Sequence, residues 1–218
     1  NYLPEIKFES DDPDFNRDTE GDHNNVVLSP SQKFQFSYFA NSTYFNKKYN
    51  HEIVRLIHYQ IINNNPIIDI SQLSFELSND TYLPPIFIAL NQLDFFVGIF
   101  ARNIIIPDIL DLTFNLNDDD PTKSDILTTL IQNLRIIHIE SCNASSGLKG
   151  FSDAIDEINE LKVEYWNLSG NNKLDFMYFP DIISKSTYPI KYLNLGYCKI
   201  KPNISAKIFK ALSMSKNI

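Results

Sequence analysis

Residues 190–200 read Ile-Lys-Tyr-Leu-Asn-Leu-Gly-Tyr-Cys-Lys-Ile. Aliphatic residues stand at the first, fourth, sixth and eleventh places of this stretch, and Cys198 stands at the ninth. The alternation of Leu193 and Leu195 predicts a short strand with one buried face, since successive side chains of a strand point to opposite sides. Cys198 follows where the chain turns out of the strand and needs a small or amide-bearing side chain. One such match is weak evidence, so the pattern has to recur to mean anything.

The same spacing recurs upstream. It fits residues 109–117, 134–144 and 158–168, which carry Asn117, Cys142 and Trp166 at the ninth place. The first places of the four stretches are separated by 25, 24 and 32 residues. Two looser matches begin at Ser31 and Ile70, each 39 residues before the next match. We therefore expect a repeated strand–loop–helix unit whose strands run parallel.

Over residues 109–212 these matches resemble the leucine-rich-repeat superfamily. Cysteine at the ninth place and a helix in each repeat are most similar to its ribonuclease-inhibitor-like and Cys-containing, F-box-associated branches. The resemblance implies an α/β fold, a curved leucine-rich-repeat solenoid with parallel strands on the concave face and helices on the convex face. It also implies a non-enzymatic scaffold that binds a partner protein through the concave face.

Two alternative roles stay open beside the plain interaction scaffold. A substrate-recognition subunit of a ubiquitin ligase would need an F-box-like helical segment, which residues 1–30 do not show. A GTPase-regulating solenoid would need an exposed catalytic Arg at a repeat edge. The arginines of the chain, none of them clearly placed in that way, are Arg17, Arg55, Arg102 and Arg135.

Composition divides the chain into three parts. Residues 1–30 are acidic and are expected to form a flexible segment. Residues 31–108 are expected to hold degenerate or enlarged N-terminal repeats, and residues 109–218 the regular repeats. The last repeat lacks an obvious polar cap, so we expect either a fragment of a longer protein or an end that a partner covers.

Local patterns predict the individual elements. Alternation and β-branched or aromatic content indicate strands, whereas a spacing of three to four residues between apolar positions indicates helices. The expected strands are residues 33–39, 73–75, 112–114, 137–139, 161–165 and the strand of residues 190–200. The expected helices are residues 51–62, 86–102, 147–157 and a last one that runs from 202 toward 212.

Charge and cysteine content limit the class of protein. A net charge of −8 and a pI near 4.9 argue against a nucleic-acid partner, because phosphate recognition needs clustered Lys and Arg. Two cysteines make no disulfide framework, which favours a reducing compartment and a cytoplasmic location. The most apolar region, residues 82–106, is interrupted by polar residues and predicts no membrane span. No motif indicates a catalytic, cofactor or metal site.

The repeat register selects candidate contact residues for the partner protein. The fourth and sixth places of each strand should face the core, and the third, fifth, seventh and eighth should face outward. Exposed tyrosines among charges have the make-up of protein-binding hot spots. The outward residues of the C-terminal repeats that we expect to bind the partner are His138, Glu140, Lys162, Glu164, Tyr165, Tyr192, Asn194 and Tyr197.

The two cysteines occupy the same place in repeats that are two units apart. Neighbouring strands lie about 4.8 Å apart, so Cys142 and Cys198 should be separated by about 10 Å. A disulfide needs Cα atoms within about 7 Å. We therefore expect two free, buried thiols with Trp166 between them.

Overall fold

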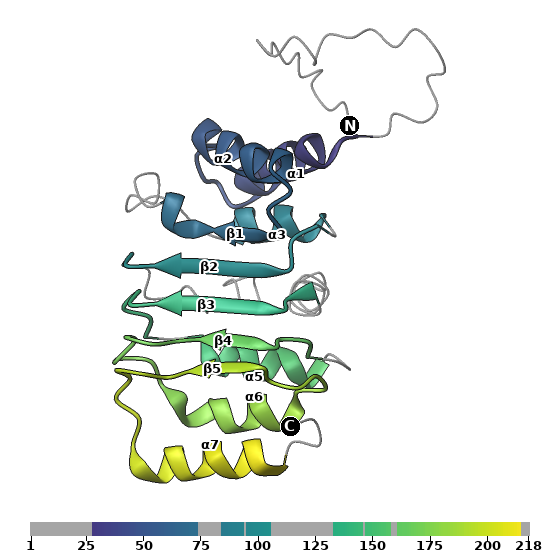
Figure 1. The fold of residues 1–218 in the computed structure, drawn as a ribbon. Coiled ribbons are helices and arrows are strands. Elements are labelled where there is room, and N and C mark those ends of the chain that lie inside the picture. The colour runs from purple at the N-terminus through teal and green to yellow at the C-terminus, as the bar shows by residue number, and fades with distance from the viewer. Residues whose placement is uncertain are drawn as a thin grey trace, which may run out of the picture.

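The computed structural model describes residues 28–73, 84–93, 95–105, 133–145, 147–157 and 161–214. It is a mixed α/β structure with one five-stranded parallel sheet, whose strands are neighbours in chain order (Figure 1). The strands are β1 (Ile67–Asp69), β2 (Gly98–Arg102), β3 (Ile136–Glu140), β4 (Tyr165–Asn167) and β5 (Tyr192–Asn194). The α-helices are α1 (Pro30–Tyr44), α2 (His51–Ile62), α3 (Pro84–Asn91), α5 (Leu148–Glu157), α6 (Phe179–Lys185) and α7 (Pro202–Met214), with 3₁₀ turns η1 (Ile70–Leu73) and η2 (Phe176–Tyr178).

Two rows of apolar side chains cross the sheet and form the core. The first row consists of paired residues of the five strands, Ile68, Ile99, Ile137, Trp166 and Leu193. The second row stands two residues further along each chain segment and consists of Ile70, Ala101, Ile139, Leu168 and Leu195. All members of both rows are at most 5% exposed except the two leucines of the β5 segment, which are half-buried. Successive members of the first row lie 31, 38, 29 and 27 residues apart.

Several predicted elements are confirmed. The helix expected at residues 51–62 is α2, the one at 147–157 is α5, and the C-terminal one is α7. The strands at 137–139 and within 190–200 are β3 and β5. The strand expected at 112–114 lies outside the described residues.

The N-terminal predictions contain two errors of element type. Residues 33–39 form part of α1 rather than a strand, because Ser29 and Gln32 make a reciprocal capping box and Pro30 opens the first turn. The helix expected at 86–102 ends at Asn91, and β2 begins at Gly98. A short apolar run does not distinguish a buried strand from a buried helix.

The repeat register is wrong at two places. In the N-terminal part, Leu73 of the strand expected at 73–75 ends η1, the described strand is β1, which starts at Ile67, and residues 74 and 75 lie outside the described residues. In the C-terminal part, Trp166 rather than Leu161 pairs with Ile137 and Leu193. The observed frame there begins five residues later than the predicted one, so that Trp166 lies in the core row instead of at the turn.

The turn after β4 is held by Asn171 and not by Trp166. Asn171 is fully buried, and its Oδ1 accepts hydrogen bonds from the backbone N–H groups of Cys142 (3.0 Å) and Ala144 (3.1 Å). Its Nδ2 donates to the carbonyls of Ile139 (2.7 Å) and Leu168 (2.9 Å). One side chain therefore satisfies four backbone groups that would otherwise be buried without partners.

Both cysteines are free, as expected, and both stand at the ninth place of their frames, as Asn171 does. Cys142 is buried and Cys198 is half-buried. The Cys142 thiol donates to the Glu140 carbonyl and the Cys198 thiol to the Leu168 carbonyl. Burial raises the pKa of both thiols, because the thiolate loses hydration in these sites.

The raised thiol pKa values predict a loss of stability in alkaline solution. A thiol in the unfolded chain ionises near pH 8.5, below its pKa in the fold, so its contribution is complete below that pH and is lost as the pH rises through the folded-state value. We expect the unfolding free energy from urea titrations to fall between about pH 8.5 and 10, before tyrosines titrate. The double variant Cys142→Ala/Cys198→Ala should show a smaller fall, and an unchanged fall would contradict the prediction.

Candidate functional site

The helices that the structure describes cover one face of the sheet and leave the other open. Phe151 of α5 and Phe179 of α6 both pack edge-on against Trp166 of the core row. Strand residues that alternate with the core rows point to the opposite side, which we call the open face. It carries, from β2 to β5, Phe100, His138, Tyr165, Tyr192, Asn167 and Asn194 together with the polar ends of β2 and β3.

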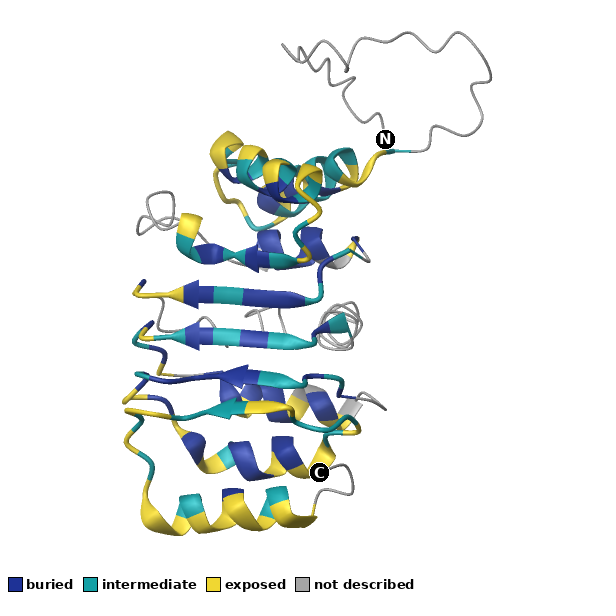
Figure 2. Ribbon diagram, viewed as in Figure 1, coloured by how far each residue is buried: buried dark blue, intermediate teal, exposed yellow. Residues whose placement is uncertain are grey.

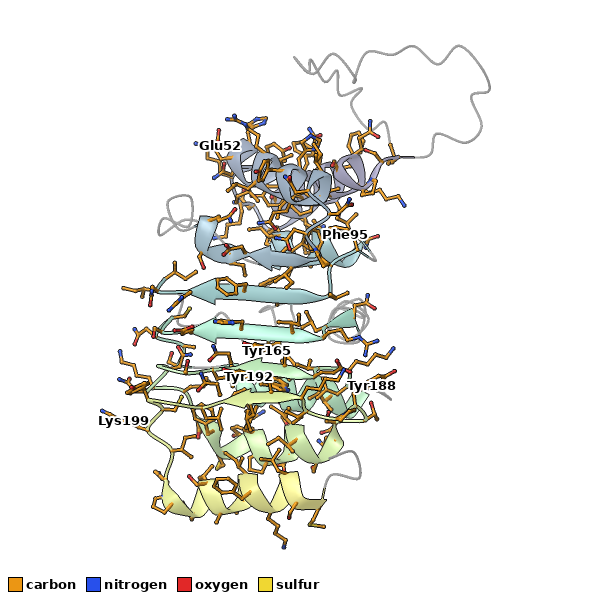
Figure 3. The ribbon with its side chains drawn as sticks, in the orientation of Figure 1. Glu52, Phe95, Tyr165, Tyr188, Tyr192 and Lys199 are labelled. Carbon is orange, nitrogen blue, oxygen red and sulfur yellow. The ribbon has the colours of Figure 1, made fainter. Side chains whose placement is uncertain are left out.

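Four rings form a continuous row across the open face. Phe100, His138, Tyr165 and Tyr192 come from four successive strands, and we call them the aromatic row. Their successive centroid distances are 4.4, 6.1 and 4.3 Å. Tyr165 and Tyr192 are parallel to within 6° and lie one beneath the other in Figure 3. Tyr192, at the β5 end, is 41% exposed, whereas the other three rings are half-buried.

A polar network lies beside the aromatic row, toward the carboxyl ends of the strands. Arg102 forms an ion pair with Glu140 (3.3 Å), and Glu140 also contacts Nε2 of His138 (3.0 Å). The buried amide of Asn167 lies 3.1 Å from the same nitrogen and accepts hydrogen bonds from both the backbone and the hydroxyl of Ser169. These contacts join three strands and orient the His138 ring within the row.

Nε2 of His138 faces two groups that make opposite demands. The Glu140 carboxylate requires a proton on this nitrogen, whereas the Asn167 amide, as a donor, requires its lone pair. The tautomer of the ring therefore decides the bond: a protonated Nε2 donates to Glu140, and an unprotonated Nε2 accepts from Asn167.

The phenol of Tyr165 is an uncharged hydrogen-bonding group on this face. Burial raises the pKa of Tyr165, and the neighbouring Tyr192 and the charge of Glu140 raise it further. Its phenol thus stays protonated at neutral pH and can donate or accept a hydrogen bond. The ring supplies apolar area at the same time, a combination that is enriched at protein interfaces.

Charged pairs border the amino ends of the strands. Lys191 forms an ion pair with Glu164 (2.9 Å), and the Arg135 guanidinium lies 4.7 Å above the ring centre of Tyr188. The lysine is 66% exposed, so this ion pair contributes little stability. Figure 3 shows Tyr188 near the starts of the strands and Lys199 beyond their ends, with Tyr165 and Tyr192 between them.

The structure brings five of the eight predicted contact residues together and separates the other three. His138, Glu140, Tyr165, Tyr192 and Asn194 lie on β3, β4 and β5. The correction of the β4 frame moves Lys162 and Glu164 off the strand, so that both precede β4. Tyr197 follows β5, whose frame is unchanged, and is 94% exposed. Tyr165 stays on the open face, but at the third place of its repeat instead of the eighth.

Three residues of the site were not among the predicted contacts. Phe100 and Arg102 were missed because residues 98–102 were assigned to a helix, and Asn167 because the β4 frame was shifted. The usable signal for Asn167 was the motif that runs from Val163 to Asn171, which has the spacing of the 190–200 stretch.

No family model matches the chain, and no curated protein matches it. Within the described ranges, no group of three or more His, Cys, Asp or Glu side chains is placed to hold a metal ion. The described helices include none whose length and hydropathy would suit a bilayer span.

Proposed function

We propose that this chain is a protein-binding scaffold, a leucine-rich-repeat solenoid that holds a partner protein against its open face. In this proposal the open face is the concave face, and the helices α5, α6 and α7 form the convex side. The proposed role is binding and not catalysis. The observation that carries it is the aromatic row, which presents four rings from four strands on the face that none of the described helices covers.

The row has the properties of a binding hot spot. Its rings are held in place by one another and by the network of Arg102, Glu140 and Asn167, so little side-chain freedom remains to be lost on binding. Apolar ring area lies next to polar groups that can orient a partner. Interfaces concentrate their binding energy in such aromatic clusters with polar surroundings.

The scaffold interpretation is also supported by the arrangement of the sheet. Parallel strands in chain order, each followed by a turn and most by a helix, form a one-dimensional stack in which each unit contacts its neighbours. Stacks of this kind offer an extended face that suits another protein. The buried Asn171 between Cys142 and Cys198 fits the ninth place of the leucine-rich repeat.

The double variant Tyr165→Ala/Tyr192→Ala should lose the partner. We expect the amount of specifically captured protein to fall by about tenfold or more, because hot-spot aromatic truncations each cost more than about 1 kcal/mol of binding. The immobilised wild type and variant are incubated with extract of the cells that express the chain, and captured proteins are quantified by mass spectrometry.

A matched variant separates the open face from exposed tyrosines in general. Tyr44 and Tyr59 are 66% and 64% exposed and belong to α1 and α2, away from the aromatic row. Tyr44→Ala/Tyr59→Ala should capture the same proteins as the wild type. Equal capture by all three proteins, with each variant folded by circular dichroism, would remove the open face as the binding site.

A further inference from the structure

The two ends of the sheet differ. Figure 1 shows α1 and α2 beyond β1, whereas β5 is the last strand at the other end. The backbone N–H of Tyr192 donates to the carbonyl of Glu164, next to β4, and the carbonyl of Asn194 accepts from the N–H of Leu168. The N–H and the carbonyl of Leu193, which lies between them, therefore point away from β4. Among the described residues no strand pairs with that edge. The edge therefore offers unpaired backbone groups to another strand.

An apolar groove lies beside this free edge, between β5 and α7. It encloses about 280 Å³. Its apolar lining consists of Leu193, Leu195, Ile200, Ile208, Phe209 and Leu212. Phe209 is 71% exposed, and Figure 2 shows α7 exposed along most of its length.

The core rows indicate what kind of segment fits the groove. The equivalents of Leu193 and Leu195 in β3 and β4 are at most 1% exposed, because a following strand with two alternating apolar residues covers each pair. Leu193 and Leu195 have no such neighbour in the part of the chain that the structure describes, and they are half-buried. A strand whose apolar residues alternate would complete the same packing at β5.

The charge of the β5–α7 region indicates what kind of segment would bind there. Residues 196–218 contain five lysines and no Asp or Glu, although the whole chain has a net charge of −8. Lys199, Lys201, Lys207 and Lys210 are all exposed. This end therefore attracts a negatively charged segment.

The same charges disfavour a second copy of this chain that docks through its described surfaces. A two-fold dimer through β5 and α7 would bring two sets of lysines together. A head-to-tail contact with α1 and α2 would also join positive surfaces, since residues 30–62 carry four Lys or Arg and one Glu. A phosphate backbone or a flat lipid surface would match the lysines, but neither would fill the groove or pair with the strand edge.

We propose that the β5–α7 end is a second docking surface, which takes an acidic segment of a partner protein as an added parallel strand. The segment pairs its backbone with the free edge at Leu193. Its alternate aliphatic side chains enter the groove, and its carboxylates face the lysines of the α7 region. This mode combines backbone pairing, which gives affinity, with side-chain pockets, which give specificity.

The test uses synthetic peptides and the full chain. The probe is a labelled peptide of about eight residues in which valine and glutamate alternate, and its counterpart has lysine in place of glutamate. Fluorescence anisotropy should show that the glutamate peptide binds at least about tenfold more tightly than the lysine peptide. Amide hydrogen exchange at Leu193 should slow by about tenfold when the peptide is bound, as expected for a newly paired strand.

Two variants on the protein side locate the site. Phe209→Asp should weaken binding of the glutamate peptide by about tenfold, and Met177→Asp, at a 50% exposed apolar residue outside the groove, should leave it unchanged. Lys199→Glu/Lys201→Glu should weaken it as well, whereas Lys173→Glu should not. Equal affinity for the two peptides, or binding that Phe209→Asp leaves unchanged, would overturn the proposal. Self-association of the chain that Phe209→Asp abolishes would assign the surface to a second copy instead.

Discussion

Replacement of Trp166 by alanine is expected to lower the free energy of unfolding by about 3 to 5 kcal/mol. The indole is 1% exposed and stands between the sheet and two helices. Phe151 of α5 and Phe179 of α6 meet it edge-on at centroid distances of 5.6 and 5.3 Å. Truncation would therefore open a cavity where three elements meet. Domains are stable by only about 5–15 kcal/mol, so the variant should lose a large fraction of the stability of the fold.

Urea denaturation followed by far-ultraviolet circular dichroism measures this effect. Tryptophan fluorescence is unsuitable, because Trp166 is the single tryptophan of the chain. The matched variant is Met177→Ala in η2, where the side chain is 50% exposed and the change should stay within about 0.5 kcal/mol. If both variants lose the same small amount, the indole does not join α5 and α6 to the sheet.

The position of Trp166 also explains why the repeat frame could be predicted only in part. The aliphatic pattern fits at Leu161 and Val163, and both side chains are indeed buried. A second frame, five residues later, fits Trp166 and Leu168 equally well, and this frame forms β4. Burial alone cannot choose between two overlapping frames. The choice depends on pairing with Ile137, which lies in another part of the chain.

The polar residues at the turns distinguish the two overlapping frames. Asn171 stands at the ninth place of the frame that forms β4, as Cys142 and Cys198 do in the neighbouring units. A frame that required Asn or Cys at this place would have rejected Trp166 as the turn residue. In β3 and β5 the predicted frame met that requirement, and there the strands were predicted correctly.

The open face was predictable where its residues lie within a correctly predicted strand. His138, Glu140, Tyr192 and Asn194 follow from alternation around core residues that are close in sequence. Phe100 does not, because β2 comes from a run that reads equally well as a helix. The aromatic row joins residues of four strands, so it depends on strand pairing over 27 to 38 positions of the chain. Local periodicity contains no information about such pairs.

Replacement of Asn171 by alanine is expected to cost about 3 kcal/mol or more of unfolding free energy. The amide accepts from the backbone of Cys142 and Ala144 and donates to the carbonyls of Ile139 and Leu168. All of these bonds are buried, and alanine would leave the four backbone groups without their partner. An unsatisfied buried polar group costs about 1–3 kcal/mol, partly offset by relaxation or an entering water.

Graded substitutions separate hydrogen bonding from packing at this residue. Asn171→Cys should destabilise less than Asn171→Ala, because a thiol can donate to a carbonyl as Cys142 and Cys198 do. Asn171→Asp keeps the acceptor for two N–H groups but turns the second carboxylate oxygen toward two carbonyls. It should therefore be less stable than the wild type at neutral pH, and acid that protonates the carboxyl should reduce this difference.

The neighbouring Asn172 supplies the control, since it has the same side chain and is exposed. Asn172→Ala should change the unfolding free energy by no more than about 0.5 kcal/mol. Hydrogen bonding at position 171 predicts the stability order wild type, Cys, Ala, and Asn171→Asp, which has almost the size of asparagine, separates this cause from packing. An equal loss for Cys and Ala would mean that the amide acts through its two accepted bonds alone, which a thiol at this place cannot replace.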